Sequence, residues 1–273
     1  MLAFALPLAL SSPLFASTPQ QGLVDTSLLV DLNPAPSTEE GSSDPKFLGE
    51  HNGEAYFTAR PGGSLERLFR TDGTNAGTVD LQANQDPFVR ITFGNAAKLP
   101  SGQFLAAGTS EDTGVELVTF GPGIDGVQIL LDIQPGPETG SFGAGSSEPI
   151  ELTLWRDEVW FFADDGVSGY ELWRSDGTAN GTRMAFELGP GPAGVVFSQG
   201  EINVAGDRLY FNGASPTQAL YVLDDPDGTP LQLVTSPTSP QFQQHASIEF
   251  GGGLFFTFHT EAQGNELWFT DGT

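Results

Sequence analysis

The chain has 273 residues, of which 35 are acidic and 10 are basic, so its formal net charge is −25. This balance argues against nucleic-acid and anionic-membrane binding, because Lys and Arg are the residues that bind phosphate groups. Cysteine is absent, which excludes disulfides and thiolate-based metal or catalytic sites. A hydrophobic content of 38% is enough for a sizeable core, so we expect a folded protein rather than a disordered one.

Residues 1–16 are apolar and uncharged, and they resemble the core of a secretory signal with cleavage after Ala16. The positive segment that normally precedes such a core is missing, so the alternatives are a start further upstream or a segment that is not a signal. The run is too short to span a bilayer, and no other stretch is a candidate. We predict a signal peptide at 1–16, a secreted or cell-surface protein, and no membrane insertion.

A repeat organises residues 17–273, which we expect to form a single domain. The phrase Glu-Leu-Trp-Arg-Ser-Asp-Gly-Thr at 171–178 returns with two changes at 266–273 and more loosely at 67–74. Weaker copies begin at Glu116 and Leu220. The aligned leucines of the five copies are 47 to 55 residues apart in sequence: Leu68, Leu117, Leu172, Leu220 and Leu267. Such a period is typical of propeller proteins.

Each unit has the same order of elements. A first strand and a tight turn precede an aromatic strand. A loop, the strand with the Glu-Leu-Trp phrase, the Asp-Gly-Thr turn, and a strand that ends in a Pro-rich loop follow. Four short strands in about 50 residues match the size of a propeller blade. We therefore predict an all-β, β-propeller-like fold of about five four-stranded blades. The units lie near 37–82, 83–133, 134–188, 189–235 and 236–273, the last together with 24–36.

The fifth unit ends directly after its Asp-Gly-Thr turn and lacks a fourth strand. Residues 24–36 contain a strand of the missing kind, Leu28–Leu32, with the Pro-rich ending that follows the fourth strands of other units. We expect residues 28–32 to pair with 266–270 and complete the last blade, which would remove two open sheet edges. The alternative is a fragment of a longer array.

The repeated phrase, with Asp164-Asp165-Gly166 before it and Gly181-Thr182 after it, resembles the ELWxxDGT repeat (hyalin-like) family of secreted or surface-associated bacterial proteins. The resemblance covers nearly all of residues 24–273 and is strongest at 155–192. It implies a propeller-like β fold and an extracellular setting. It implies no catalytic residues.

The repeated turn contains regularly spaced acidic residues. An Asp in such a turn accepts a hydrogen bond from its own backbone two residues later, and the following Gly takes a positive φ. A lone Asp per turn does not supply the six to eight oxygens that calcium prefers, so the calcium interpretation is the alternative here. We interpret the following turn residues as structural: Asp72, Gly73, Thr74, Asp176, Gly177, Thr178, Asp227, Gly228, Asp271 and Gly272.

Two denser acidic loops are the candidates for metal binding. They contain Asp164 with Asp165, and Asp225 with Asp227. The second loop resembles the beginning of a calcium loop, but the downstream bidentate Glu is missing. We expect solvated acidic loops, with calcium ligation by these four residues as the alternative, and calcium is the one cofactor that the sequence suggests.

The four tryptophans, Trp155, Trp160, Trp173 and Trp268, are expected to pack between blades, with a sugar-binding surface as the alternative. The eight arginines are scattered along the chain, and no Gly-x-Ser-x-Gly motif is present. The sequence therefore predicts a non-catalytic binding or surface-interaction scaffold with a glycan or protein ligand. The alternative is an extracellular polysaccharide hydrolase with paired carboxylates in the propeller channel.

Overall fold

The computed structural model describes residues 28–32, 42–63, 65–83, 89–92, 96–136, 145–189, 191, 201–213, 218–236, 247–260 and 264–273. Within these residues every regular element is a β-strand, apart from one short 3₁₀ helix at Pro61–Gly63. No helix in this part of the chain is long and apolar enough to cross a membrane.

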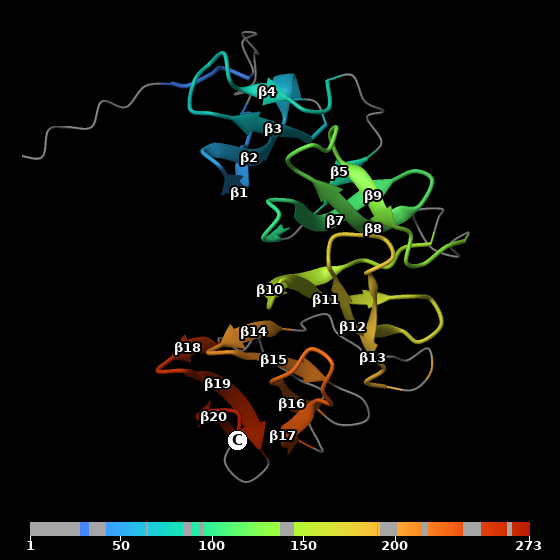
Figure 1. Cartoon of the computed structure of the whole chain (residues 1–273), viewed down its shortest axis with the longest axis vertical. Helices are drawn as coiled ribbons and strands as arrows, with labels where there is room; N and C mark the ends of the chain where they lie inside the picture. Colours follow the sequence, from blue (N-terminus) through green and yellow to red (C-terminus); the bar gives the residue numbers. More distant parts are fainter. Residues whose placement is uncertain are drawn as a thin grey trace, which may run out of the picture.

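The strands form five antiparallel sheets in chain order, here called blades 1 to 5 (Figure 1). Blade 1 contains β1 (Lys46–His51), β2 (Glu54–Ala59), β3 (Arg67–Thr71) and β4 (Val79–Asp80). Blade 2 contains β5 (Arg90–Ile91), β6 (Ala97–Lys98), β7 (Phe104–Ser110), β8 (Gly114–Phe120) and β9 (Gln128–Leu131), and both β5 and β6 pair with β7.

Blade 3 contains β10 (Ile150–Trp155), β11 (Glu158–Asp164), β12 (Tyr170–Ser175) and β13 (Arg183–Phe186). Blade 4 contains β14 (Ile202–Ala205), β15 (Arg208–Gly213), β16 (Gln218–Leu223) and β17 (Leu231–Ser236). Blade 5 contains β18 (Ile248–Phe250), β19 (Gly253–Thr260) and β20 (Gly264–Thr270).

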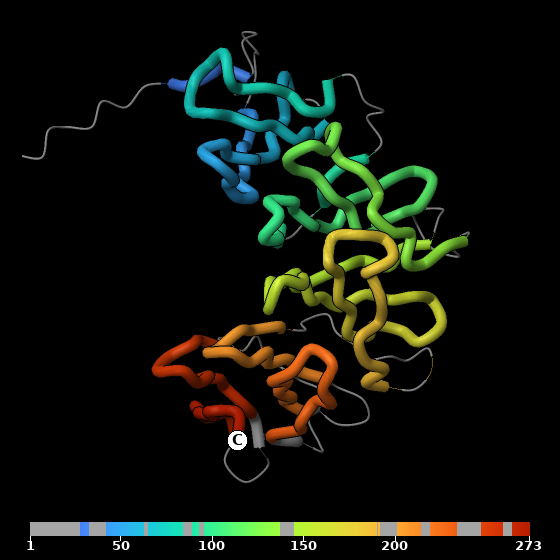
Figure 2. The backbone as a smooth tube through the Cα atoms, in the orientation of Figure 1, coloured from blue at the N-terminus to red at the C-terminus, as the bar shows by residue number. Residues whose placement is uncertain are grey.

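The blades follow one another around an arc that is open between blade 1 and blade 5 (Figure 2). The first strands of the blades, among them β1, β10, β14 and β18, lie towards the concave side, and the fourth strands lie towards the convex side (Figure 1). The prediction of an all-β protein with five propeller-like blades is confirmed. The propeller is not strictly closed.

The hydrophobic core is divided into layers between neighbouring blades. A middle strand is therefore apolar on both faces: Val159, Phe161 and Ala163 of β11 pack towards blade 2, while Trp160 and Phe162 pack towards blade 4. Trp155 and Trp173 are also buried in these layers, and Trp268 packs against the layer between blades 4 and 5. The expected packing role of the tryptophans is confirmed.

The predicted completion of the last blade is wrong. Among the described strands β20 pairs with β19 alone, and blade 5 has three strands. The carbonyl oxygen of Leu29 accepts a hydrogen bond from the side chain of Asn75 at 3.2 Å, and Leu32 packs against Phe57 and Phe69, so the segment 28–32 lies on blade 1. This placement shields apolar side chains that the first blade would otherwise expose.

The glutamate of the repeated phrase is buried and binds backbone amides. Glu171 on β12 accepts hydrogen bonds from the amides of Leu188 at 2.5 Å and Gly189 at 3.1 Å, just beyond the end of β13. Burial raises the pKa of Glu171 to about 7, and the two amide donors act in the opposite direction. The carboxyl group thereby holds the chain that follows the fourth strand.

Glu116 has the same role in blade 2. Its carboxyl oxygens accept hydrogen bonds from the amide of Ile133 at 2.8 Å and from the amide of Ser147 at 2.9 Å. Ser147 lies shortly before β10, so Glu116 also fixes the entry into blade 3. In blade 5 the corresponding Glu266 is exposed, and no described strand follows β20 there.

Replacing Glu171 by Ala should lower the free energy of unfolding by about 2–4 kcal/mol, because two buried amides lose their acceptor. Glu266→Ala is the matched control at the same repeat position, and it should change stability by less than about 0.5 kcal/mol because Glu266 is exposed. Urea denaturation measures both values. Equal losses in the two variants would contradict the assigned role of Glu171.

Candidate functional site

Three copies of the Asp-Gly-Thr turn share one hydrogen-bond pattern. The Oδ1 atom of Asp176 accepts hydrogen bonds from the amide of Thr178 at 2.8 Å and from its hydroxyl at 2.7 Å. Asp72 and Asp271 make the same two bonds to the threonines two residues later. The threonine hydroxyl, followed by the amide, lowers the pKa of each of these aspartates.

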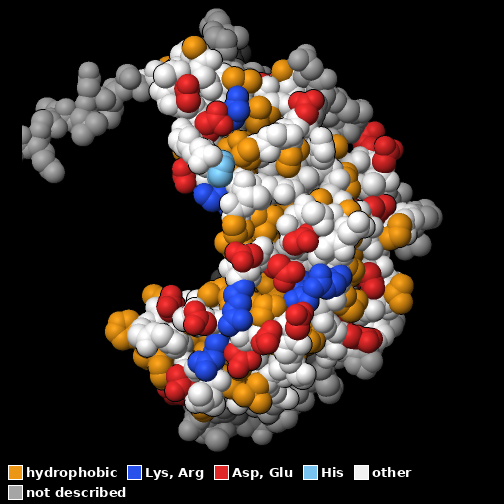
Figure 3. Space-filling view, in the orientation of Figure 1, with side chains coloured by type: hydrophobic (Ala, Val, Ile, Leu, Met, Phe, Trp, Pro, Cys, Tyr) orange, Lys and Arg blue, Asp and Glu red, His pale blue; other side chains and the backbone are white. Residues whose placement is uncertain are grey.

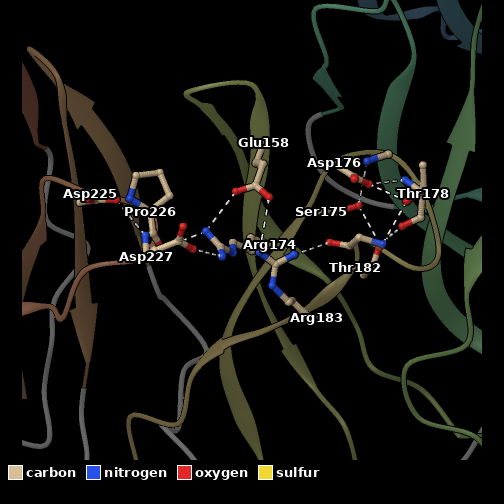
Figure 4. Close-up of polar contacts among 12 residues, drawn as sticks. Glu158, Arg174, Ser175, Asp176, Thr178, Thr182, Arg183, Asp225, Pro226 and Asp227 are labelled. Atoms are coloured by element: carbon tan, nitrogen blue, oxygen red, sulfur yellow. Dashed lines mark hydrogen bonds and ion pairs between the residues drawn. The ribbon is translucent and has the colours of Figure 1, made fainter.

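The glycine of these turns has a positive φ, 91° at Gly177, as the structural interpretation predicts. In the same turn the hydroxyl groups of Ser175 and Thr182 lie 2.7 Å apart (Figure 4). The aspartates of these three turns are therefore engaged within the turn itself.

The copy in blade 4 differs from the prediction. Asp225 accepts the hydrogen bond from the amide two residues later, that of Asp227, at 3.0 Å. Gly228 does not take a positive φ. The side chain of Asp227 is free to leave the turn, and it pairs with Arg174 of blade 3. One extra Asp in the loop thus moves the capping role two residues upstream.

Arg174 joins blades 3 and 4 from a nearly buried position on β12 (Figure 4). Its guanidinium pairs with Glu158 at 3.2 Å, donates to the carbonyl oxygen of Pro226 at 2.9 Å, and contacts Asp227. The arginine lowers the pKa of Asp227, first through the hydrogen bond and then through its charge. The same carboxylate, Glu158, also lies 3.9 Å from Arg183.

Similar contacts join other neighbouring blades. The amide side chain of Gln103 in blade 2 donates to the carbonyl oxygen of Gly177 in blade 3 at 2.9 Å. Arg208 in blade 4 donates to the carbonyl oxygen of Asp271 in blade 5 at 2.5 Å. Basic and acidic side chains interleave over this part of the surface (Figure 3). The repeated turns therefore serve as contacts between blades.

The four candidate metal ligands do not come together. Asp164 lies at the end of β11, where it accepts from the amide of Gly166 at 2.7 Å, and Asp165 accepts from the amide of Ser168 at 2.6 Å. Asp227 shares Arg174 with Glu158, the first residue of β11, whereas Asp164 is the last residue of the same strand. The length of seven extended residues separates Asp227 from Asp164 by about 20 Å. Within the described chain no group of three or more His, Cys, Asp and Glu is arranged to hold a metal ion.

A pair of glutamates at the starts of inner strands was not anticipated from the sequence. Glu151 is the second residue of β10, and Glu201 directly precedes β14 of the next blade. Glu151 takes an unusual φ of 59°. Burial, and then the nearby charge of Glu201, raises the pKa of Glu151.

Glu201 faces a pocket between blades 4 and 5. The hydroxyl of Ser247 donates to its carboxylate at 3.1 Å, and the Asn203 side chain also bonds to it. Burial raises the pKa of Glu201 despite these two bonds. The pocket has about 350 Å³ of empty volume, part of it open to solvent. Its lining is Glu201, Asn203, Tyr210, Phe211, Asn212, Leu220, Ser247, Leu254, Phe256, Thr257 and Phe258.

The two carboxyl groups have neighbours suited to hydrogen bonding rather than to charge neutralisation. None of the ion pairs in the described chain involves Glu151 or Glu201. The sequence signal that points to them is an acidic residue where the inner strands of two consecutive units begin. It becomes visible only after the units have been aligned.

No family model and no curated protein matches the chain. Similar solved structures include a puromycin-hydrolyzing peptidase of Mycobacterium tuberculosis, at 12% identity and a TM-score of 0.49, covering 84% of this chain and 36% of the peptidase. The chain thus spans about a third of that protein's length.

A lectin in complex with alpha methyl fucoside is similar at 12% identity and a TM-score of 0.39, with 85% of this chain and 78% of the lectin covered. An alpha-L-arabinofuranosidase from Clostridium thermocellum is similar at 14% identity and a TM-score of 0.30, with 84% and 85% covered. At these identities the likeness is limited to the fold.

Replacing Asp176 by Ala should lower the melting temperature by about 2–4 °C, because the cap of the turn is lost. Asp224→Ala removes an exposed aspartate from the corresponding loop of blade 4 and should leave the melting temperature unchanged. Thermal denaturation with calcium and with a chelator is the accompanying measurement. A rise with calcium that Asp176→Ala abolishes would contradict the structural role of this turn.

Proposed function

We propose that the chain is a non-catalytic binding module for neutral glycans, and that the pocket between blades 4 and 5 is its site. The observation that supports this most is the convergence of three polar side chains, Glu201, Asn203 and Ser247, on an otherwise largely apolar pocket. Such pockets, with apolar walls and a few placed polar groups, are the usual form of small-ligand sites.

The polar groups suit sugar hydroxyls. A carboxylate accepts hydrogen bonds, an amide side chain both donates and accepts, and a serine hydroxyl does both, which matches the dual character of each hydroxyl of a sugar. Glu201 is already oriented by its bonds to Ser247 and Asn203, so little ordering is required when a ligand binds.

Charge favours a neutral ligand over an acidic one. The pocket lining contains one carboxylate and no basic side chain, Glu151 lies nearby, and the whole chain carries a formal charge of −25. An acidic sugar would meet repulsion from Glu201 without a compensating cation.

The second candidate function is hydrolysis of a polysaccharide, and the pairing of Glu151 with Glu201 favours it. Glycosidases use two carboxyl groups, one protonated as the acid and one ionised. Burial raises the pKa of both Glu151 and Glu201, which is the direction that a general acid requires. The proposal of a non-catalytic module predicts that this pair does not turn over substrate.

Two further proposals accompany this function. Membership of the ELWxxDGT repeat family is supported by the repeated phrase at 171–178 and 266–273. A secreted or cell-surface location is supported by the apolar, uncharged residues 1–16.

An array of neutral oligosaccharides should contain at least one that the chain binds, with a dissociation constant of about 10 µM to 1 mM. For the oligosaccharide identified, Glu201→Gln should weaken binding by at least about tenfold, because a charged acceptor is lost. Glu111→Gln is the matched control: it makes the same change at an exposed position in blade 2 and should bind like the wild type.

Two outcomes would contradict the proposal. Equal binding by Glu201→Gln and the wild type would show that the pocket between blades 4 and 5 is not the binding site. Release of reducing sugar that stops in both Glu151→Gln and Glu201→Gln would instead establish the hydrolase.

A further inference from the structure

The pocket between blades 4 and 5 contains a buried donor that the described fold does not use. Asn212 on β15 is 6% exposed and lines the pocket. Its Oδ1 atom accepts a hydrogen bond from the backbone amide of Glu201 at 2.9 Å, which fixes the orientation of the side-chain amide. In the described part of the chain no acceptor pairs with the Nδ2 atom. Because a buried amide nitrogen without a partner is costly, this donor indicates a ligand.

The repeat shows that a polar side chain with a free donor is unusual at this position. Asn212 is the cross-strand partner of Leu220, the leucine of the repeated phrase. In blades 2 and 3 the partner of that leucine is apolar and buried, Ala107 and Phe162. In blade 1 it is Thr58, whose hydroxyl donates to a carboxylate at 2.6 Å. Blade 4 therefore differs from blades 1 to 3 in placing an unused donor between blades.

A strong acceptor lies beside this donor. The backbone amide of Asn212 donates to the carbonyl oxygen of Glu201 at 3.4 Å, so the two residues face each other across neighbouring segments. The Glu201 carboxylate accepts from Ser247 and Asn203, and its two oxygens have acceptor capacity left. An ionised carboxylate only accepts, so the ligand group that meets Glu201 must carry a donor. The group that meets the Nδ2 atom of Asn212 must be an acceptor.

The remaining lining of the pocket is mainly apolar. Leu220, Leu254, Phe256 and Phe258 are buried and belong to the layer between blades 4 and 5. A hydroxyl group placed against such walls would lose its hydrogen bonds to water, whereas a methyl group gains free energy from burial there. The complementary ligand group therefore combines a donor, an acceptor and a small apolar part.

We propose that the pocket binds the acetamido group of an N-acetylated sugar, an inference that rests on the proposed glycan-binding function. The N–H of the acetamido group donates to Glu201, its carbonyl oxygen accepts from Asn212, and its methyl group packs against the apolar walls. A ring hydroxyl has no apolar part, and the methyl group of a 6-deoxy sugar has no polar partner to offer. The acetamido group is also uncharged, which suits a chain with a formal charge of −25.

Isothermal titration calorimetry of the full chain with triacetylchitotriose and with cellotriose tests this inference. The two trisaccharides have the same linkage and differ in carrying an acetamido group or a hydroxyl on each ring. The wild type should bind triacetylchitotriose at least about tenfold more tightly, because a hydrogen bond and the burial of a methyl group are added.

Asn212→Asp should abolish this preference, because it keeps the acceptor for the backbone amide of Glu201 and removes the donor. Asn180→Asp is the matched control: it makes the same change at an exposed position in blade 3 and should retain the preference. Circular dichroism verifies that each variant is folded, and the comparison of the two sugars with the wild type does not depend on either variant.

Three outcomes would overturn the inference. Equal or tighter binding of cellotriose by the wild type would overturn it and leave the proposed glycan-binding function standing. Absence of binding to triacetylchitotriose would also overturn it, and the array of neutral oligosaccharides then decides separately on the proposed function. A preference that persists in folded Asn212→Asp would show that Asn212 does not recognise the acetamido group.

Discussion

A buried carboxylate that accepts backbone amides is the contact on which the outer edges of blades 2 and 3 depend. The fourth strands of blades 1 to 3 are short, two residues in β4 and four in β9 and β13, so ladder hydrogen bonds alone hold little of the chain there. Glu171 and Glu116 reach past the strand end and bind the amides that follow. The cost of burying a carboxyl group appears as a raised pKa, and the bonds to otherwise unpaired amides offset it.

The partners of each carboxylate indicate where a functional site is expected. The aspartates of the repeated turns are engaged by their own threonines, and Asp227 is engaged by Arg174 of the neighbouring blade. Those carboxylates organise turns and join blades. Glu201 differs because its partners are neutral side chains at the rim of a pocket, which leaves acceptor capacity for a ligand.

Local features were predictable from the sequence and long-range choices were not. The capping of Asp72 and Asp176 depends on residues two positions away, so the pattern sufficed to predict it. The position of Leu28–Leu32 depends on which exposed apolar face it covers, and its strand-like pattern is equally suited to blade 5 and blade 1. Glu151 and Glu201 are separated by a whole repeat, and their proximity follows only from the stacking of blades.

Amide hydrogen exchange tests the role of the buried glutamate most directly. Leu188 and Gly189 lie beyond the last residue of β13, where a free loop would exchange rapidly. The account predicts that both amides are protected nearly as well as those of β12, since Glu171 accepts their hydrogen bonds. Exchange of Leu188 and Gly189 at the rate of an unprotected loop would contradict it.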